Sequence, residues 1–297
     1  MAAVVYPGSG GYDFGSTNHD VAMTILRKIL GQMVRRLASM PIGQRRYCCV
    51  CQEYVFKFLP YTPKGLIPYK PPQFIVEMDV IGSEIRSFSC PRCGSHDRER
   101  HLLLYLGATG LAEKIAGLRV LHLAPEPHVS KFILDKRPSI YVKGDLFPVH
   151  HDIQKIDLQA IPFPDRSFEL VIANHVLEHV QDDKLALSEI KRVLAPEGYA
   201  ILQTPYSNTL TGLFEDAGIA TGPARLQAYG QEDHVRLYGR DIRQRFASAG
   251  FQDLSLDHKV ALTSLDAWKY GVNSREPLLL FQKVDQDNLS SRDLHAK

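Results

Sequence analysis

The sequence predicts an α/β protein in which an open, mostly parallel sheet follows a small cysteine-bearing module. Residues 169–202 have the pattern of a buried strand, a helix and a second buried strand. Shorter apolar runs at residues 119–124 and 140–146 supply two earlier strands. Two pairs of closely spaced cysteines precede all of these strands in the chain. Together these observations indicate one large sheet domain and one small module.

The strand at residues 169–173 (ELVIA) is apolar and mostly β-branched, which is typical of a strand buried on both faces. Asp182 and Asp183 can cap the next helix, whose apolar residues recur every three to four positions until Pro196-Glu197-Gly198 stops it. Residues 199–202 then begin the second strand. Such sheets bind ligands at the carboxyl ends of their strands. We therefore expect a site beside the polar side chains that follow Ala173, namely Asn174, His175, Glu178 and His179.

Composition and charge exclude few classes of protein. The chain has 297 residues and a formal net charge of +2, which gives no general argument for a polyanionic partner. Basic residues are concentrated between positions 21 and 72, where Glu53 is the single acid. No apolar run is long enough to cross a bilayer, and the first residues lack the pattern of a secretory signal. We expect a cytoplasmic location.

The cysteines form two Cys-x-x-Cys pairs, Cys48 with Cys51 and Cys90 with Cys93. Each pair presents two sulfurs to one point, so four thiolates can complete a tetrahedral shell around Zn²⁺. We predict a structural zinc ion in a zinc-ribbon-like module, with Cys49 as a spare thiol. A redox-active pair and cysteines buried in a core are the alternatives, and neither explains why two pairs occur.

The predicted organisation has four parts. Residues 1–47 form a helical arm, 48–97 the zinc-ribbon-like module, 98–284 the sheet domain and 285–297 a polar tail. Within the arm, residues 1–17 are Gly-rich and expected to be loose. Residues 18–40 form an amphipathic helix that packs on the domain or acts as a lid; the alternative is a basic helix lying on a membrane surface. Its predicted apolar face is Ala22, Leu26, Ile29, Leu30, Met33 and Leu37.

Two motifs carry a resemblance to a known family. The runs PFPDRSFELVIANHVLEHV and RVLAPEGYAILQTP resemble the class I S-adenosylmethionine (SAM) dependent methyltransferases of the type 11 group. The resemblance extends over residues 118–284, and CPRCGSHDRER is similar to a family variant with an N-terminal CxxC…CPxCGS segment. It implies a Rossmann-like sheet, SAM as the cofactor and methyl transfer as the reaction.

In this family, the loop after the first strand is rich in glycine, because the backbone must approach the methionine end of SAM closely. This chain departs from that pattern. His122 stands at the usual acidic position, and Ala124, Glu126 and His128 stand where glycines are expected. Glu126 is then a candidate to contact the SAM ammonium group.

The resemblance also implies the remaining cofactor residues. Asp145, at the end of the second strand, suits the two ribose hydroxyls, and Leu146 follows it. An aspartate that caps a turn is the alternative for this position. Asp157 matches the acidic residue beside the adenine, with Leu158 supplying a backbone contact, and Asn174 is placed near the methionine end.

The segment YGQEDHVRLYGRD, residues 229–241, is similar to FGQxDHVRxYGxD of the same family variant. We predict His234 as the general base, with Asp233 or another carboxylate orienting its imidazole. His175 competes for the role, since it follows the strand that ends at Ala173. A salt-bridged turn that orients the next helix is the structural alternative.

The predicted function is methyl transfer from SAM to an oxygen or nitrogen of a small molecule, such as a glycan, a lipid or a specialised metabolite. One alternative is an RNA methyltransferase that uses the zinc module and the basic region. The chain has NHVLEH where enzymes that methylate base amines have Asn-Pro-Pro-Tyr, which disfavours nucleic acid as the partner. A second alternative is a non-catalytic scaffold, which the missing glycines permit.

Overall fold

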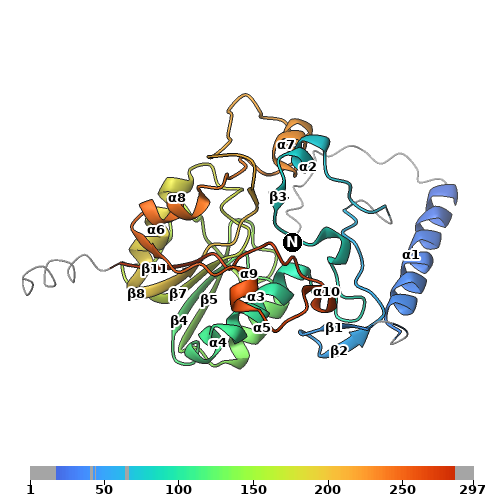
Figure 1. The fold of residues 1–297 in the computed structure, drawn as a ribbon, viewed down its shortest axis with the longest axis horizontal. Helices are drawn as coiled ribbons and strands as arrows, with labels where there is room; N and C mark the ends of the chain where they lie inside the picture. Colours follow the sequence, from blue (N-terminus) through green and yellow to red (C-terminus); the bar gives the residue numbers. More distant parts are fainter. Residues whose placement is uncertain (1–17, 41–42, 44, 64–66, 285–297) are drawn as a thin grey trace, which may run out of the picture. The chain divides into compact units, whose positions relative to one another are not determined.

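The computed structural model describes residues 18–40, 43, 45–63 and 67–284. The predicted loose segment 1–17 and the predicted tail 285–297 lie outside these residues. The chain divides into two compact units, each assembled from separate stretches (Figure 1). Unit 1 comprises Met1–Lys70, Ser83–Leu104 and Ser264–Asn273; unit 2 comprises Pro71–Gly82, Tyr105–Thr263 and Ser274–Lys297.

Unit 2 contains a mixed sheet whose order among the described residues is β10-β11-β8-β7-β4-β5-β6. Strands β4 to β8 pair in parallel, and β10 and β11 are antiparallel to their neighbours, which confirms the predicted mostly parallel sheet. The strands are β4 (Arg119–Leu123), β5 (Ile140–Asp145), β6 (Gln154–Lys155), β7 (Phe168–Ala173), β8 (Leu194–Ile201), β10 (Phe251–Asp253) and β11 (Leu280–Lys283).

Neighbouring strands β4 and β7 mark the point where the order of the sheet reverses. The chain leaves β4 towards β5 on one side, and it leaves β7 towards β8 on the other. Because the connections diverge there, open α/β sheets form their ligand crevice at the carboxyl ends of such a strand pair. Asn174 and His175, directly after β7, are therefore in the expected place.

In helix α6 (Asp183–Val193), the local sequence determines where the helix begins and which face packs in the core. The Asp182 side chain accepts hydrogen bonds from the amides of Lys184 and Leu185, which confirms its predicted capping role. The apolar face of α6 is buried in the main core with the strands. Helix α6 ends at Val193 and β8 begins at Leu194, earlier than the predicted Tyr199. Pro196-Glu197-Gly198 still interrupts the strand, because pairing with β7 breaks after Leu194 and resumes at Tyr199, and Glu197 has φ of +59°.

The remaining helices of unit 2 are short. A smaller cluster of Ile75, Tyr229 and Leu237 packs α2 against α7, beside the two-stranded sheet of β3 and β9. The elements are α2 (Gln73–Glu77), β3 (Val80–Ile81), α4 (Leu111–Lys114), α5 (Pro127–Asp135), β9 (Tyr206–Ser207), α7 (Gly222–Tyr229), α8 (Ile242–Ser248) and α9 (His258–Ala261); α3 (Asp97–Ala108) begins in unit 1 and ends in unit 2.

Unit 1 is organised around the cysteines and one buried arginine. Its elements are α1 (Asn18–Ala38), the antiparallel pair β1 (Arg46–Cys48) and β2 (Glu53–Val55), the 3-10 turn η1 (Ile85–Ser87) and α10 (Ala267–Tyr270). The guanidinium of Arg100 is fully buried and lies 3.9 Å from the centre of the Phe58 ring. It donates hydrogen bonds to the carbonyls of Ser95 and Gly271, among others, so a segment remote in sequence belongs to this unit.

Helix α1 confirms the predicted helix and presents a wide apolar surface. Its C-terminal Ala38 accepts a hydrogen bond from the amide of Phe56, which ties the helix to β2. The large apolar side chains along it are 39–59 % exposed: Met23, Ile25, Leu26, Ile29, Leu30, Met33, Val34 and Leu37. Within the described part of the chain, no helix is both long enough and apolar enough to cross a membrane.

Candidate functional site

The loop after β4 begins at Ala124, which adopts a left-handed backbone with φ of +48°. Its amide donates a 2.8 Å hydrogen bond to the carbonyl of Gly144 at the end of β5. A residue with a Cβ in this region costs roughly 1–2 kcal/mol. The chain therefore keeps here a backbone conformation that glycine adopts most readily, although the glycine itself is absent.

Glu126 occupies the centre of a buried polar network at the same strand ends. One carboxylate oxygen lies 2.9 Å from Nε2 of His122, and the other accepts a hydrogen bond from the side-chain amide of Asn174. His122 in turn lies 2.9 Å from the Tyr141 hydroxyl. Burial acts to raise the pKa of Glu126, but the hydrogen bond and charge of His122 outweigh it, so the net pKa is lowered. The loop after β4 thus places an ionised carboxylate beside the end of β7.

The predicted ribose and adenine residues lie at the ends of neighbouring segments. Asp145 ends β5, and its Oδ1 accepts a 2.8 Å hydrogen bond from the amide of Phe147, so the carboxylate also caps a turn. Leu146 is exposed. Asp157 caps a similar turn through the amide of Gln159, and the Leu158 side chain is buried in the main core. Leu158 can therefore offer a ligand its backbone but not its side chain.

A second polar cluster follows β7. His175 has φ of +58°, and its amide donates to the carbonyl of Gln203 after β8. Its Nδ1 lies 3.2 Å from Oε1 of Glu178, and its Nε2 lies 3.6 Å from Oε1 of Glu276. The other oxygen of Glu178 accepts a 2.8 Å hydrogen bond from Thr204. Burial acts to raise the pKa of Glu178, but the hydrogen bond from His175 and the nearby histidines lower it overall.

His234 joins this cluster from a distant part of the sequence. It is 2 % exposed, and its Nδ1 lies 3.1 Å from the carbonyl of Tyr229. Its ring packs edge-on against that of His179, with centroids 4.8 Å apart. Burial and the charge of His179 lower the pKa of His234 to about 4, so the imidazole is neutral at neutral pH.

The prediction that Asp233 orients His234 is not what the structure shows. Asp233 Oδ2 lies 3.4 Å from Nδ1 of His179, whereas a backbone carbonyl orients His234. Adjacent residues in an extended or turning chain point in different directions, so Asp233 and His234 serve two different imidazoles. The structure nevertheless brings Asp233, His234 and His175 into one neighbourhood through His179 and Glu178.

Other residues of the 229–241 segment have structural roles. The buried guanidinium of Arg236 donates to the carbonyls of Leu177 and Gln181 and pairs with Glu215. Tyr238 is fully buried and donates to Asp183 at the start of α6. The segment therefore has features of both interpretations of its sequence. Arg236 and Tyr238 hold it in place as a structural turn, and His234 belongs to the polar cluster after β7.

Sequence reasoning missed the parts that Thr204 and Glu276 play in this cluster. Thr204 follows β8, and a polar residue at the carboxyl end of a parallel strand was a usable signal. Glu276 comes from a loop before β11, and nothing in its local sequence indicates that it is buried beside His175.

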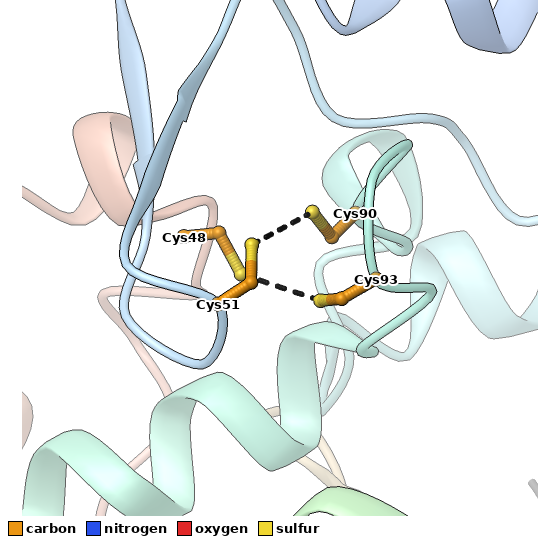
Figure 2. A group of neighbouring side chains, drawn as sticks. All are labelled: Cys48, Cys51, Cys90 and Cys93. Atoms are coloured by element: carbon orange, nitrogen blue, oxygen red, sulfur yellow. Dashed lines mark hydrogen bonds between the residues drawn. The ribbon is translucent and has the colours of Figure 1, made fainter.

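The four predicted metal-binding cysteines converge in unit 1 (Figure 2). Cys48 Sγ lies 3.8 Å from Cys93 Sγ, and Cys51 Sγ lies 3.9 Å from Cys90 Sγ. A tetrahedral zinc ion with sulfur ligands at about 2.3 Å has sulfur–sulfur edges of about 3.8 Å, so the donor set fits this ion. Cys49 stands apart, with its Sγ 3.6 Å from the carbonyl of Arg100, and burial raises the pKa of its thiol to about 12.

Part of unit 2 is similar to known proteins. Residues 111–202 match the family model described as "Methyltransferase domain". A malonyl-acyl-carrier-protein O-methyltransferase of Halorhodospira halophila is 37 % identical over 101 residues, which cover 34 % of this chain and 32 % of that protein. The enzyme of the same name from Erwinia billingiae is 26 % identical over 125 residues, covering 41 % of this chain and 50 % of that protein.

The chain therefore spans only about a third to a half of the length of these curated relatives. Among solved structures, a SAM-dependent methyltransferase of Mesorhizobium loti is 16 % identical with a TM-score of 0.43, over 60 % of this chain and 96 % of that one. The family match covers about a third of this chain, and the matched residues 111–202 contain the parallel strands β4 to β8.

Proposed function

We propose that this protein transfers the methyl group of SAM to an oxygen or nitrogen atom of a small-molecule acceptor. The observation that carries the proposal is the set of groups at the carboxyl ends of β4, β5 and β7. Ala124 keeps a left-handed backbone there, Glu126 places an ionised carboxylate beside Asn174, and Asp145 ends β5. These groups fit the close backbone approach, the ammonium group and the ribose of SAM.

Each part of SAM then has a proposed partner. Glu126, oriented by His122 and Asn174, faces the methionine end, and Asp145 accepts the ribose hydroxyls. Asp157 and the backbone of Leu158 contact the adenine. SAM itself supplies a sulfonium that is already a good leaving group, so the protein has to position the acceptor and remove one proton.

The acceptor is proposed to bind beside His175, Asp233 and His234. Oxygen is the favoured acceptor atom, because two relatives are named as O-methyltransferases. Glycans, lipids and specialised metabolites remain the proposed classes of acceptor. The low pKa of His234 keeps its imidazole neutral at neutral pH, so one ring nitrogen has a free lone pair. The same low pKa makes the imidazole a weak base, which gives little driving force for removing a proton from the acceptor.

An RNA acceptor is the second candidate, on one observation. Tyr54 and Phe56 are exposed on β2 and just after it, and Arg45 lies 6.0 Å from the centre of the Tyr54 ring. Exposed aromatic rings beside basic residues suit stacking with unpaired bases. Binding to a single-stranded RNA that weakens steeply with salt would support this candidate over a small molecule.

In unit 1 we propose one structural zinc ion bound by Cys48, Cys51, Cys90 and Cys93. Four sulfurs close the coordination shell, so this ion would stabilise folding and take no substrate. The nearly ideal separation of the sulfurs supports the proposal.

A calorimetric titration with SAM tests the main proposal. Asp145→Ala should weaken SAM binding about 10- to 100-fold, because a hydrogen bond to a charged group contributes roughly 1.5–3 kcal/mol. Asp135→Ala is the matched control, since Asp135 is an exposed carboxylate paired with Lys131 on the surface of α5. Absence of SAM binding by the wild type would favour the non-catalytic scaffold instead.

A further inference from the structure

Glu178, His179 and His234 bring three metal-binding atoms together in unit 2. We propose that they form a second metal site, which holds a divalent first-row transition-metal ion through two imidazoles and one carboxylate. One ligand atom from each residue lies within 4.8 Å of the others. Ligands at about 2.1 Å from one ion are at most about 4.2 Å apart, so closing the site requires side-chain shifts of less than about 1 Å.

The His234 imidazole is already oriented as a ligand. The carbonyl of Tyr229 can only accept a hydrogen bond, so the proton sits on Nδ1 and the lone pair on Nε2. Among the residues that the structure describes, none forms a hydrogen bond with this buried Nε2. Leaving such an acceptor without a partner costs about 1–3 kcal/mol, and a bound cation would remove that cost.

His179 repeats the arrangement with a carboxylate in place of the carbonyl. Its Nδ1 lies 3.4 Å from Oδ2 of Asp233, which leaves Nε2 available as a ligand. Metal-binding histidines usually donate their second ring N–H to a carboxylate or a backbone carbonyl, which fixes the ring and makes it a better ligand. Both imidazoles of the proposed site have such a partner, and this explains why Asp233 contacts His179.

Glu178 supplies the third ligand, and its carboxylate is held in place. Thr204 donates to one of its oxygens, and Nδ1 of His175 lies 3.2 Å from the other. Each carboxylate oxygen has two lone pairs, so these contacts leave one on each oxygen for a metal. The side chain is 1 % exposed, and a buried carboxylate is usually paired with a cation.

Main-chain contacts hold the two ligand-bearing segments together. The amide of Val235, next to the ligand His234, donates a 3.0 Å hydrogen bond to the carbonyl of the ligand Glu178. Arg236, next along the chain, donates to the carbonyls of Leu177 and Gln181 on either side of Glu178 and His179. Ligands from segments more than fifty residues apart are thus positioned before any ion binds.

The donor set indicates the class of ion and its use. Two imidazoles and a carboxylate suit Zn²⁺, Fe²⁺ or Mn²⁺, and three protein ligands leave coordination positions open. This site therefore differs from the closed cysteine cluster. On the proposed function, the ion would lower the pKa of an acceptor hydroxyl bound to it, so water could take the proton in place of the weak base His234. Metal binding itself does not depend on that function.

Cobalt titration of the zinc-loaded protein tests the proposal. Co²⁺ uptake is followed by its visible absorption and by equilibrium dialysis, with elemental analysis to verify that the cysteine-bound zinc stays in place. We expect one cobalt per chain with a spectrum of nitrogen and oxygen ligands, lacking the intense bands of thiolate coordination, and competition by added Zn²⁺ or Mn²⁺.

Variants then locate the ion. His234→Ala and His179→Ala should each weaken Co²⁺ binding more than 100-fold, and Asp233→Asn should weaken it about 10- to 100-fold, as loss of an orienting partner usually does. His151→Ala is the matched control, because His151 and His150 form an exposed pair that could attract metal unspecifically. His179 is about one-third exposed, so its replacement tests the site even if His234→Ala fails to fold.

Two results would overturn the inference. One is a wild type that takes up neither Co²⁺ nor Mn²⁺ beyond its cysteine-bound zinc. The other is Co²⁺ affinity that is unchanged in His179→Ala and His234→Ala or that depends on His151. SAM titration of the same samples separates the two proposals, since SAM binding without cobalt uptake refutes the metal site alone, and cobalt uptake without SAM binding refutes only the proposed function.

Discussion

Ala124 carries backbone strain at the candidate cofactor site. Its left-handed conformation is sterically unfavourable for any side chain, yet the hydrogen bond to Gly144 and the start of α5 at Pro127 hold the loop in that shape. Alanine has the smallest Cβ substituent, so it is the least costly replacement for glycine here. The loop can therefore remain close to a ligand without its usual glycines.

This strain leads to opposite expectations for two substitutions. Ala124→Gly should leave stability nearly unchanged, because relief of strain is offset by greater freedom of the unfolded chain, and SAM should bind at least as tightly. Ala124→Val should lose about 1–3 kcal/mol of unfolding free energy, since a β-branched residue is strongly disfavoured at positive φ. Urea unfolding and SAM titration measure both effects.

The control for the valine variant is Ala108→Val at the exposed end of α3, where only helix propensity changes and the loss should stay below about 1 kcal/mol. Equal stability and SAM affinity of Ala124→Val and the wild type would show that the strain has no role in the site.

At this scale, residue types were easier to predict than their partners. The sequence placed Glu126, Asn174 and His234 at a site, and the structure brings each into a buried polar network. It did not show that Asp233 serves His179 rather than its neighbour His234. Side-chain direction in a turn depends on backbone dihedral angles, which a motif of residue types does not specify.

Among the elements, α6 depends on charge at its first turn as well as on its apolar face. Asp183 is buried there, accepts two hydrogen bonds of 2.7 and 2.8 Å from Arg245 of α8, and accepts a third from Tyr238. Burial acts to raise the pKa of Asp183, but the hydrogen bond from Arg245 and the charges of Arg236 and Arg245 outweigh it, so the pKa is lowered. The carboxylate thus links α6, α8 and the 229–241 segment.

Asp183→Asn should therefore reduce the free energy of unfolding by about 2–3 kcal/mol at pH 7, because the half-buried guanidinium of Arg245 loses its charged partner. The pKa of Asp183 in the folded protein lies below its value of about 3.9 in the unfolded chain. The ionised carboxylate therefore stabilises the wild type fully above about pH 3.9, and this stabilisation is lost as the pH falls through the folded pKa. The difference between variant and wild type should shrink from pH 5 to pH 3. Urea unfolding across this range measures it.

Asp165→Asn serves as the control, because Asp165 is an exposed carboxylate paired with Arg192, and the expected loss is below about 1 kcal/mol at any pH. If the stability difference between Asp183→Asn and the wild type stays constant down to pH 3, the Asp183 carboxyl group is not ionised in the folded protein as inferred.

The order of elements followed from the sequence better than their ends. Strand periodicity and the family resemblance predicted the mostly parallel sheet that the structure contains. The boundary between α6 and β8 differs from the prediction because Leu194 already pairs with Phe168 of β7, although regular pairing resumes only at Tyr199. Tertiary pairing decides such ends, and local sequence does not report it.

Over the whole molecule, the chain divides into units that do not follow consecutive ranges of sequence. Residues 264–273 belong to unit 1, where Arg100 donates to the carbonyls of Tyr270 and Gly271 and where Arg46 lies 4.2 Å from the centre of the Trp268 ring. Backbone carbonyls are present at every position, so the partners of Arg100 leave no trace in the sequence. The four cysteines were predictable because metal binding requires particular residue types at fixed spacings.

Together with the proposed zinc site, this architecture predicts how the protein responds to chelation. Binding of structural zinc supplies folding free energy, so Cys51→Ser or strong chelation should unfold unit 1 as one cooperative body. Amides of residues 264–273 should lose protection from hydrogen exchange together with β1 and β2, although they lie far away in sequence, whereas β4 and β7 should stay protected.

Cys49→Ser is the matched control, because Cys49 stands outside the cluster, and this variant should retain one zinc and full protection. Mass-spectrometric exchange on peptides from both units measures this, with elemental analysis of the same samples; protection that persists in 264–273 while β1 and β2 open, or a full zinc complement in Cys51→Ser, would refute it.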